Sequence, residues 1–410
     1  MRNKIFLSAL MFLSVNMAWS QSLHSEAENT LTDGILNLDL GGQGNRVRIG
    51  GFVSAGGHFT EIKNAESDNG FNIDNAFLSL EGSFLNDKLG FFLQADFADS
   101  YPLLDAYVTY RPIKDLVFSV GQKQTFTNSR DLMLHDQSTA TGEHSPMSQE
   151  FNERGRELGA YAEYRLPTTR LGVDLGLAVT SGDGRNSFGS SSTDPDNGSL
   201  KYGGRVTVYP MGYFKRGNEL VFFDFIREAT PKLAIGGAFS YNNGASNAKG
   251  EGHGDFTMYD REGNAAYPGL RKLTADLLFK WQGFTFLADY TNTTGAKLDN
   301  LYTAANVNAK LQPEEISQYL ALGNGLDVQA GYITKSLWAV NFGYSYVKPE
   351  FAEVANSVLR RMSSYDIGIS KFFCKNTFRL QLLGNYTHYH KEVMTPYKNR
   401  SIKMNLQIMF

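Results

Sequence analysis

The sequence RSIKMNLQIMF, residues 400–410, places apolar side chains at every second position and polar side chains between them. This period of two is that of a β-strand, whose neighbouring side chains point to opposite faces, so that one face can meet lipid and the other water. A tilted strand of roughly 9–11 residues also crosses the hydrocarbon core of a bilayer. Amphipathic strands occur in soluble β-sandwiches as well, so the pattern indicates a membrane strand only if it recurs along the chain.

The alternation does recur, as a unit of strand, very short turn, strand and longer loop. In the clearest example, residues 76–84 and 89–97 alternate on either side of a turn at 86–88, which is typical of a β-hairpin. The chain has no apolar stretch of about 18 or more residues, so a spanning structure must pair its backbone groups between strands in a closed barrel. We therefore predict an all-β protein, a transmembrane antiparallel β-barrel of about sixteen strands. The predicted strands are 47–59, 76–84, 89–97, 104–110, 116–120, 158–164, 171–179, 202–208, 233–241, 273–279, 284–290, 326–332, 338–346, 365–369, 378–386 and 400–410.

The first twenty residues have the pattern of a secretory signal peptide. Arg2 and Lys4 precede an apolar run at 5–13, and Ala18 and Ser20 are small residues at the expected cleavage site. We expect residues 1–20 to be removed, residues 21–45 to form a periplasmic extension, and residues 46–410 to form the barrel. Loss of Arg2 and Lys4 changes the formal net charge from −3 to −5, which argues against a protein that binds nucleic acid.

An even number of strands places both termini on the periplasmic side, so the short turns are periplasmic and the long connections extracellular. The third long connection, residues 126–156, is of special interest, because a barrel of this size can hold an aqueous channel. We expect this loop to fold inward and narrow the lumen; the alternative is a mobile surface loop. The segment 211–231 is periplasmic yet long, and the sequence leaves open whether it forms a small helix or an irregular strand extension.

Several short motifs share an order and spacing. They are VGQKQTF at 120–126, RELG at 156–159, SGDG at 181–184 and GRVTVYP at 204–210. In this succession, from about residue 47 to residue 410, the chain resembles the phosphate-selective porin O and P family. The resemblance implies a sixteen-stranded, typically trimeric outer-membrane channel for small hydrophilic solutes or inorganic anions, with phosphate as the solute of its best-known members. The chain departs from the family pattern where Gln122 directly precedes Lys123 and Thr125 replaces a proline, a departure that bears on the phosphate preference.

Anion selectivity requires Arg and Lys side chains along the lumen wall. The pore-lining or constriction candidates are Lys123, Arg130, Arg154, Arg156, Arg205, Lys272, Lys280, Arg379 and Lys403. Arg111, Arg165 and Lys371 are further inward candidates, and the same faces carry Asp96, Asp105, Glu163, Asp276, Asp289, Asp327 and Asp366. A lumen with both signs would orient polar solutes more than it selects one sign of ion. Each inward cation could equally form a salt bridge that stiffens the barrel wall.

Other classes of function have less support. The chain has no nucleophile elbow, His-Glu-x-x-His helix or phosphate-binding loop, and His388 and His390 lack nearby partners for a metal site. We therefore expect no enzyme, cofactor or metal. The predicted function is passive diffusion through a porin in the outer membrane of a Gram-negative bacterium, as a homotrimer in contact with outer-membrane lipid. The terminal Phe410 resembles the tag that the barrel-assembly machinery reads. The alternative is a non-transporting barrel that acts as a surface receptor, adhesin or scaffold through its long outer loops.

Overall fold

The computed structural model describes residues 36–40, 45–63, 65–166, 170–186, 200–215, 217–252, 254–305, 310–354, 356–373, 377–390 and 398–410. The predicted signal peptide and most of the predicted extension at 21–45 lie outside these ranges, as do the turns predicted at 167–169 and 374–376.

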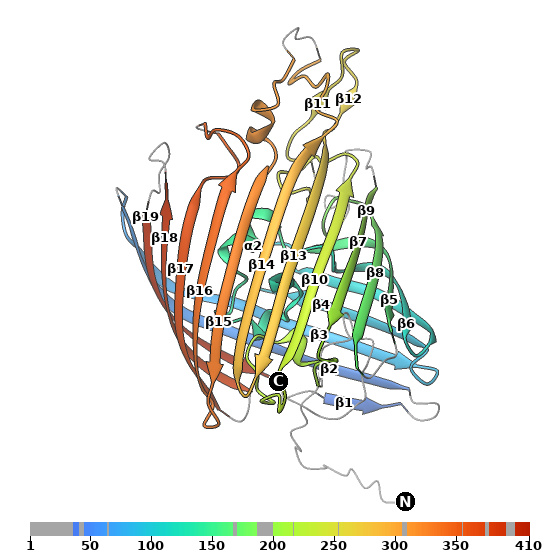
Figure 1. Cartoon of the computed structure of the whole chain (residues 1–410), viewed down its shortest axis with the longest axis vertical. Coiled ribbons are helices and arrows are strands. Elements are labelled where there is room, and N and C mark those ends of the chain that lie inside the picture. Colours follow the sequence, from blue (N-terminus) through green and yellow to red (C-terminus); the bar gives the residue numbers. More distant parts are fainter. Residues whose placement is uncertain are drawn as a thin grey trace, which may run out of the picture.

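Sixteen antiparallel strands form a closed barrel (Figure 1), which confirms the predicted fold class. Strands pair with their neighbours in chain order, and β19 pairs with β2 to close the ring, with Ile402 opposite Phe59. The strands are β2 (Arg46–Ile62), β3 (Asp68–Phe84), β4 (Leu89–Asp96), β5 (Leu103–Ile113), β6 (Leu116–Gln124), β7 (Arg156–Arg165), β8 (Gly172–Thr180), β9 (Lys201–Tyr209), β10 (Lys232–Asn242), β13 (Gly269–Trp281), β14 (Phe284–Ala296), β15 (Gly323–Ile333), β16 (Trp338–Pro349), β17 (Met362–Phe373), β18 (Phe378–Tyr389) and β19 (Lys398–Met409).

The alternation of side chains sorts each strand into a lipid face and a lumen face. In β19, Ile402 and Met404 are 60% and 56% exposed, whereas Asn405 and Gln407 are buried inside. In a membrane, the exposed apolar side chains would contact acyl chains, and the polar ones would pair within the lumen. The pattern at 400–410 therefore predicted the orientation of this strand correctly.

Tight turns join the strands at the end where the C-terminus lies (Figure 1). Between β13 and β14, Gln282 and Gly283 both adopt positive φ values, 52° and 93°, as a two-residue hairpin turn requires. At the same end, β1 (Leu36–Asp39) pairs with the first residues of β2, Leu36 opposite Ile49. Part of the predicted extension thus forms an added strand beside the barrel.

The longer connections carry short helices. Residues between β6 and β7 form α1 (Arg130–Met133), η2 (Asp136–Ser138) and α2 (Pro146–Phe151), and Figure 1 shows this segment within the ring of strands. The segment 211–231 contains η4 (Asn218–Leu220), which answers the question that the sequence left open: it is an irregular turn with one short 3-10 helix. In the described part of the chain, no helix is long and apolar enough to cross a membrane.

Two extracellular connections pack on each other beyond the barrel rim. One carries the hairpin of β11 (Met258–Tyr259) and β12 (Ala265–Ala266), and the other carries η5 (Glu315–Gln318). Tyr259 and Tyr302 exchange two backbone hydrogen bonds of 2.9 Å. Met258 and Ile316 belong to the hydrophobic cluster beneath them. These loops form a small folded cap at the extracellular end (Figure 1).

Candidate functional site

The loop predicted at 126–156 spans residues 125–155 between β6 and β7 in the structure. This third loop crosses the lumen to the opposite wall. The backbone N–H groups of Arg130 and Asp131 donate to the carboxylate of Asp289 on β14, at 2.8 and 3.0 Å. Farther along the loop, the carbonyl of Ala140 accepts from Gln381 Nε2 on β18 at 2.8 Å. The loop leaves the wall at β6 and is held at β14 and β18, so it divides the interior of the barrel.

Two arginines converge on one carboxylate at the centre of this contact. Arg130 Nε donates to Asp276 Oδ1 at 2.6 Å, and Arg205 donates to the other oxygen of Asp276. Arg205 also donates to the carbonyl of Asn128 at 3.3 Å. Both guanidinium groups are buried, and charge-assisted hydrogen bonds are the strong ones in such surroundings. Asp276 therefore fixes the start of the third loop to β13.

A second group of charges holds the middle of the loop. Arg156 Nη2 lies 2.7 Å from Asp136, and its Nε lies 3.3 Å from Asp105. His144 lies between Asp131 and Asp136, with one ring nitrogen 3.3 Å from each carboxylate. Burial alone would lower the pKa of His144, but the two carboxylates outweigh it and raise the pKa to about 9. The imidazole is therefore charged at neutral pH and joins the two aspartates.

Three further buried cations hold the third loop or the segment 211–231. Lys272 Nζ donates to the carbonyl of Phe151 at 2.9 Å, and Arg379 donates to the carbonyl of Ala140 at 2.9 Å. Lys280 Nζ donates to the carbonyl of Asn218 at 2.6 Å. The predicted pore-lining cations that are at most 5% exposed are Lys123, Arg130, Arg156, Arg205, Lys272, Lys280 and Arg379. Six of them bind within the third loop or hold it or the segment 211–231, whereas Lys123 pairs with Glu163 on the neighbouring strand β7. The role of all seven in conduction stays a prediction.

Two of the predicted candidates, Lys403 and Arg154, border the open lumen. A third cation, Lys371, lies on the lipid-facing side of the barrel wall. Lys403 bridges Asp74 on β3 and Glu143 of the third loop, at 3.0 and 2.6 Å. Arg154 lies 2.9 Å from Asp99 with 37% of its side chain exposed. Lys371, expected to point inward, was assigned wrongly: its Nζ lies 5.4 Å from the centroid of the Trp338 ring on the outer surface. Lys371 is an even number of residues from the lipid-facing Ile367 and Ile369 in the same strand, so its side chain points to the same face.

Two polar cavities lie between the third loop and the wall. One, of about 420 Å³, is bordered by β2 and β17–β19, and the other, of about 340 Å³, by β3. Their described carboxylates are Asp74, Asp136, Glu143, Glu150, Glu153 and Asp366. Their described cations are Arg154 and Lys403, together with the charged His144. The accessible part of the lumen is therefore rich in acidic groups.

The sequence interpretation missed Asp74 as a lumen residue. The predicted strand began at 76, whereas β3 begins at Asp68. Phe71 and Ile73 are exposed on the outer face, 92% and 64%, and so is Leu78, 43%. The outward positions therefore change from odd to even numbers along β3, at the register shift opposite Ser54 and Ala55. Extending the period of two from Ala76 and Leu78 would have assigned Asp74 to the lipid face, so periodicity alone could not have identified it as a lumen residue.

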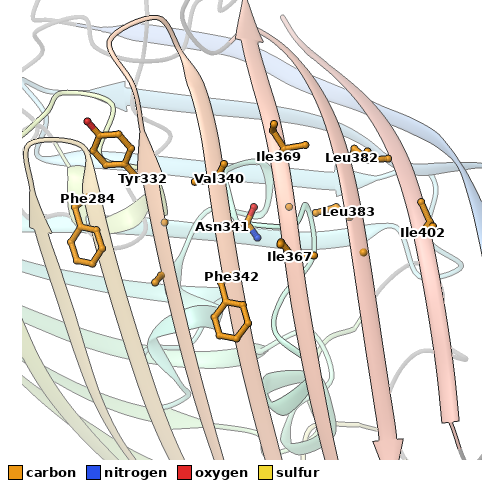
Figure 2. Close-up of a pocket in the computed structure, with 14 residues that line it drawn as sticks. Phe284, Tyr332, Val340, Asn341, Phe342, Ile367, Ile369, Leu382, Leu383 and Ile402 are labelled. Carbon is orange, nitrogen blue, oxygen red and sulfur yellow. The ribbon is translucent and has the colours of Figure 1, made fainter.

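An apolar hollow of about 750 Å³ lies on the outer wall, apart from the lumen (Figure 2). Phe284, Tyr332, Phe342 and Ile402 surround it on β14, β15, β16 and β19. It is on the face of the strands that meets lipid, so it belongs to the membrane contact and not to the solute path.

No known family model matches this chain, and no curated protein sequence matches it. Solved structures do match. The outer-membrane channel DcaP of Acinetobacter baumannii superimposes with a TM-score of 0.56 at 14% identity, over 92% of this chain and 100% of that one. OmpT expressed in the outer membrane of Vibrio cholerae gives 0.52 at 14% identity, over 90% and 99%. OmpF of Salmonella typhi, in complex with daunomycin, gives 0.50 at 14% identity, over 92% and 100%. The likeness shows the fold: the chain has the architecture of Gram-negative outer-membrane β-barrel channels.

Proposed function

We propose that this protein is a porin of the Gram-negative outer membrane through which small hydrophilic solutes diffuse passively, without catalysis. The observation that carries the proposal is the third loop, anchored across the lumen with polar cavities at its side. A barrel of about this size holds an aqueous channel, and a loop of fixed position sets its width. The solute path then follows β2, β3 and β17–β19.

We further propose that the path prefers cations weakly. The cavities carry more described carboxylates than cations, and Lys403 is itself held between Asp74 and Glu143. Most predicted anion-binding cations instead neutralise buried acids or bind loop carbonyls. Fixed charges on the wall set the ion preference of a channel. The alternative is a preference for phosphate, which the resemblance of the sequence motifs implies.

We propose a homotrimer as the assembly. A structure of OmpT of Vibrio cholerae is in trimer form and superimposes on this chain with a TM-score of 0.51. The outer wall offers a broad apolar surface for lipid or for a neighbouring barrel. We also propose that the aromatic Phe410, beside β19, contacts the barrel-assembly machinery.

The test is single-channel recording of the purified protein in a planar bilayer, with the reversal potential measured under a salt gradient and phosphate titrated in. Stable steps with a weak cation preference and no block by phosphate would support the proposal. Anion preference with phosphate block would support the phosphate alternative. Absence of steps would support a non-transporting barrel that acts through its outer loops.

A further inference from the structure

The periplasmic segment 211–231 lies inside the barrel end and contacts the lumen wall through aromatic side chains. Phe214, Phe222 and Phe223 are buried in one hydrophobic cluster with wall residues from several strands. The ring of Phe223 lies edge-on to Phe372 of β17, with centroids 5.7 Å apart. Gly331 of β15 makes room for this packing, since a Cβ there would be 2.6 Å from the Phe222 ring. The lumen wall is therefore apolar where the segment 211–231 contacts it, and the two surfaces bury each other.

Polar contacts fix the same segment to the wall. Lys280 Nζ on β13 donates to the carbonyls of Asn218 and Val221, at 2.6 and 2.5 Å. The backbone N–H of Gly283 donates to Asp224 Oδ2 at 2.8 Å, and Arg227 Nη1 donates to the carbonyl of Ile333 at 2.5 Å. Because donors on the wall satisfy buried carbonyls and a buried carboxylate of the segment, the segment has one defined position.

The segment also supports the third loop. The backbone N–H of His135 donates to the carbonyl of Leu220 at 2.9 Å, and that of Phe222 donates to the carbonyl of Ser138 at 3.0 Å. Leu134 and Ala140 of the loop pack in the same hydrophobic cluster as the phenylalanines. The two elements, which enter the lumen from opposite ends of the barrel, therefore form one packed unit.

We propose that residues 211–231 are a second pore-narrowing element, a fixed plug that closes the periplasmic end of the lumen along β13–β17 and carries the third loop. Solutes that pass the third loop then leave along the side of β2, β3, β18 and β19. This inference rests on the proposed porin function. It adds that conductance is set by two elements that support each other.

The first test removes the packing or the anchor of the plug. In one variant Phe222 and Phe223 are both changed to Ala, and in another Lys280→Met removes the ammonium that holds the segment. The matched control changes two lipid-facing phenylalanines, Phe239 and Phe342, to Ala. In planar bilayers we expect about a twofold rise in single-channel conductance with added flicker for the plug variants and no change for the control. Native conductance and noise in folded plug variants would overturn the inference.

A second readout does not depend on conduction. A spin label attached to the cysteine of a Thr141→Cys variant reports the mobility of the third loop in proteoliposomes. Cys374→Ser removes the native cysteine so that only position 141 is labelled. We expect increased mobility in both plug variants. If the native protein does not conduct but the label becomes mobile, the plug holds the loop and only the porin proposal fails. If the native protein conducts and the label stays rigid in the plug variants, the porin proposal stands and the plug inference fails.

Discussion

Arg130 in the third loop and Asp276 on β13 form an ion pair of 2.6 Å in the interior of the barrel, 146 residues apart in sequence. Arg205 binds the second oxygen of the same carboxylate. Since both side chains are almost fully buried, water cannot solvate the charge that remains if one partner is removed. Asp276 is thus a central wall anchor of the loop that narrows the lumen, beside Asp289 and Gln381.

Loss of this aspartate should destabilise the barrel and release the loop. We expect Asp276→Asn to lower the free energy of unfolding by about 3–5 kcal/mol, the usual cost of breaking a buried pair. Urea unfolding in detergent micelles measures this change. The control is Arg46→Gln, which breaks a half-exposed pair with Asp87 and should cost about 0–1 kcal/mol. Equal effects in the two variants would mean that the buried pair does not anchor the loop.

Ion preference should respond to Lys403. We expect Lys403→Met to make the channel more cation-selective, because Asp74 and Glu143 would then face the path without their counter-charge. The reversal potential under a tenfold KCl gradient reports the change. Lys371→Met removes the same charge from the outer surface and should leave the potential as it is. A shift of the same size in both variants would place the selectivity filter elsewhere.

Open-channel noise should depend on the charge of His144. The pKa of this imidazole is raised from 6.5 to about 9 in the folded protein. The stability that it contributes is therefore fully present below about pH 6.5 and is lost as the pH rises through about 9. We expect the third loop to loosen and the noise to increase between pH 8 and roughly pH 10. His144→Asn should be noisier at neutral pH and should lose this pH dependence. A native-like titration in that variant would assign the transition to another group.

Two neighbouring glycines offer a further comparison. At Gly236 a Cβ would lie 2.2 Å from Arg205 Nη2 and 2.6 Å from Asp276 Oδ1, whereas at Gly237 the nearest atom is 3.5 Å away. Gly236→Ala should therefore displace the Arg205–Asp276 pair and cost about 1–3 kcal/mol of unfolding free energy. Gly237→Ala, on the other face of the same strand, should be nearly neutral. Thermal unfolding followed by circular dichroism compares them, and equal melting temperatures would contradict the expected crowding.

The alternation of apolar and polar residues was sufficient to predict the strands and most of their faces. It works because a strand has period two and because lipid and water demand opposite side chains on its two faces. Its errors are local. Asp74 was missed because β3 extends past the predicted start and changes phase at a register shift opposite Ser54 and Ala55. Lys371 was assigned to the wrong face although its parity with Ile369 was visible in the sequence.

The filling of the lumen was decided only by the tertiary structure. The sequence places Lys272, Lys280 and Arg379 on inward faces, yet the groups that they bind come from Phe151, Asn218 and Ala140, each more than 60 residues away along the chain. Periodicity shows which side of the wall a residue is on, but it contains no information about which loop will meet it there. The sequence by itself therefore determined a sixteen-stranded membrane barrel with charged groups inside, because that pattern is local. Which charges are buried as anchors and which border the open cavities depends on long-range packing of the third loop and the periplasmic segment, and only the folded chain shows it.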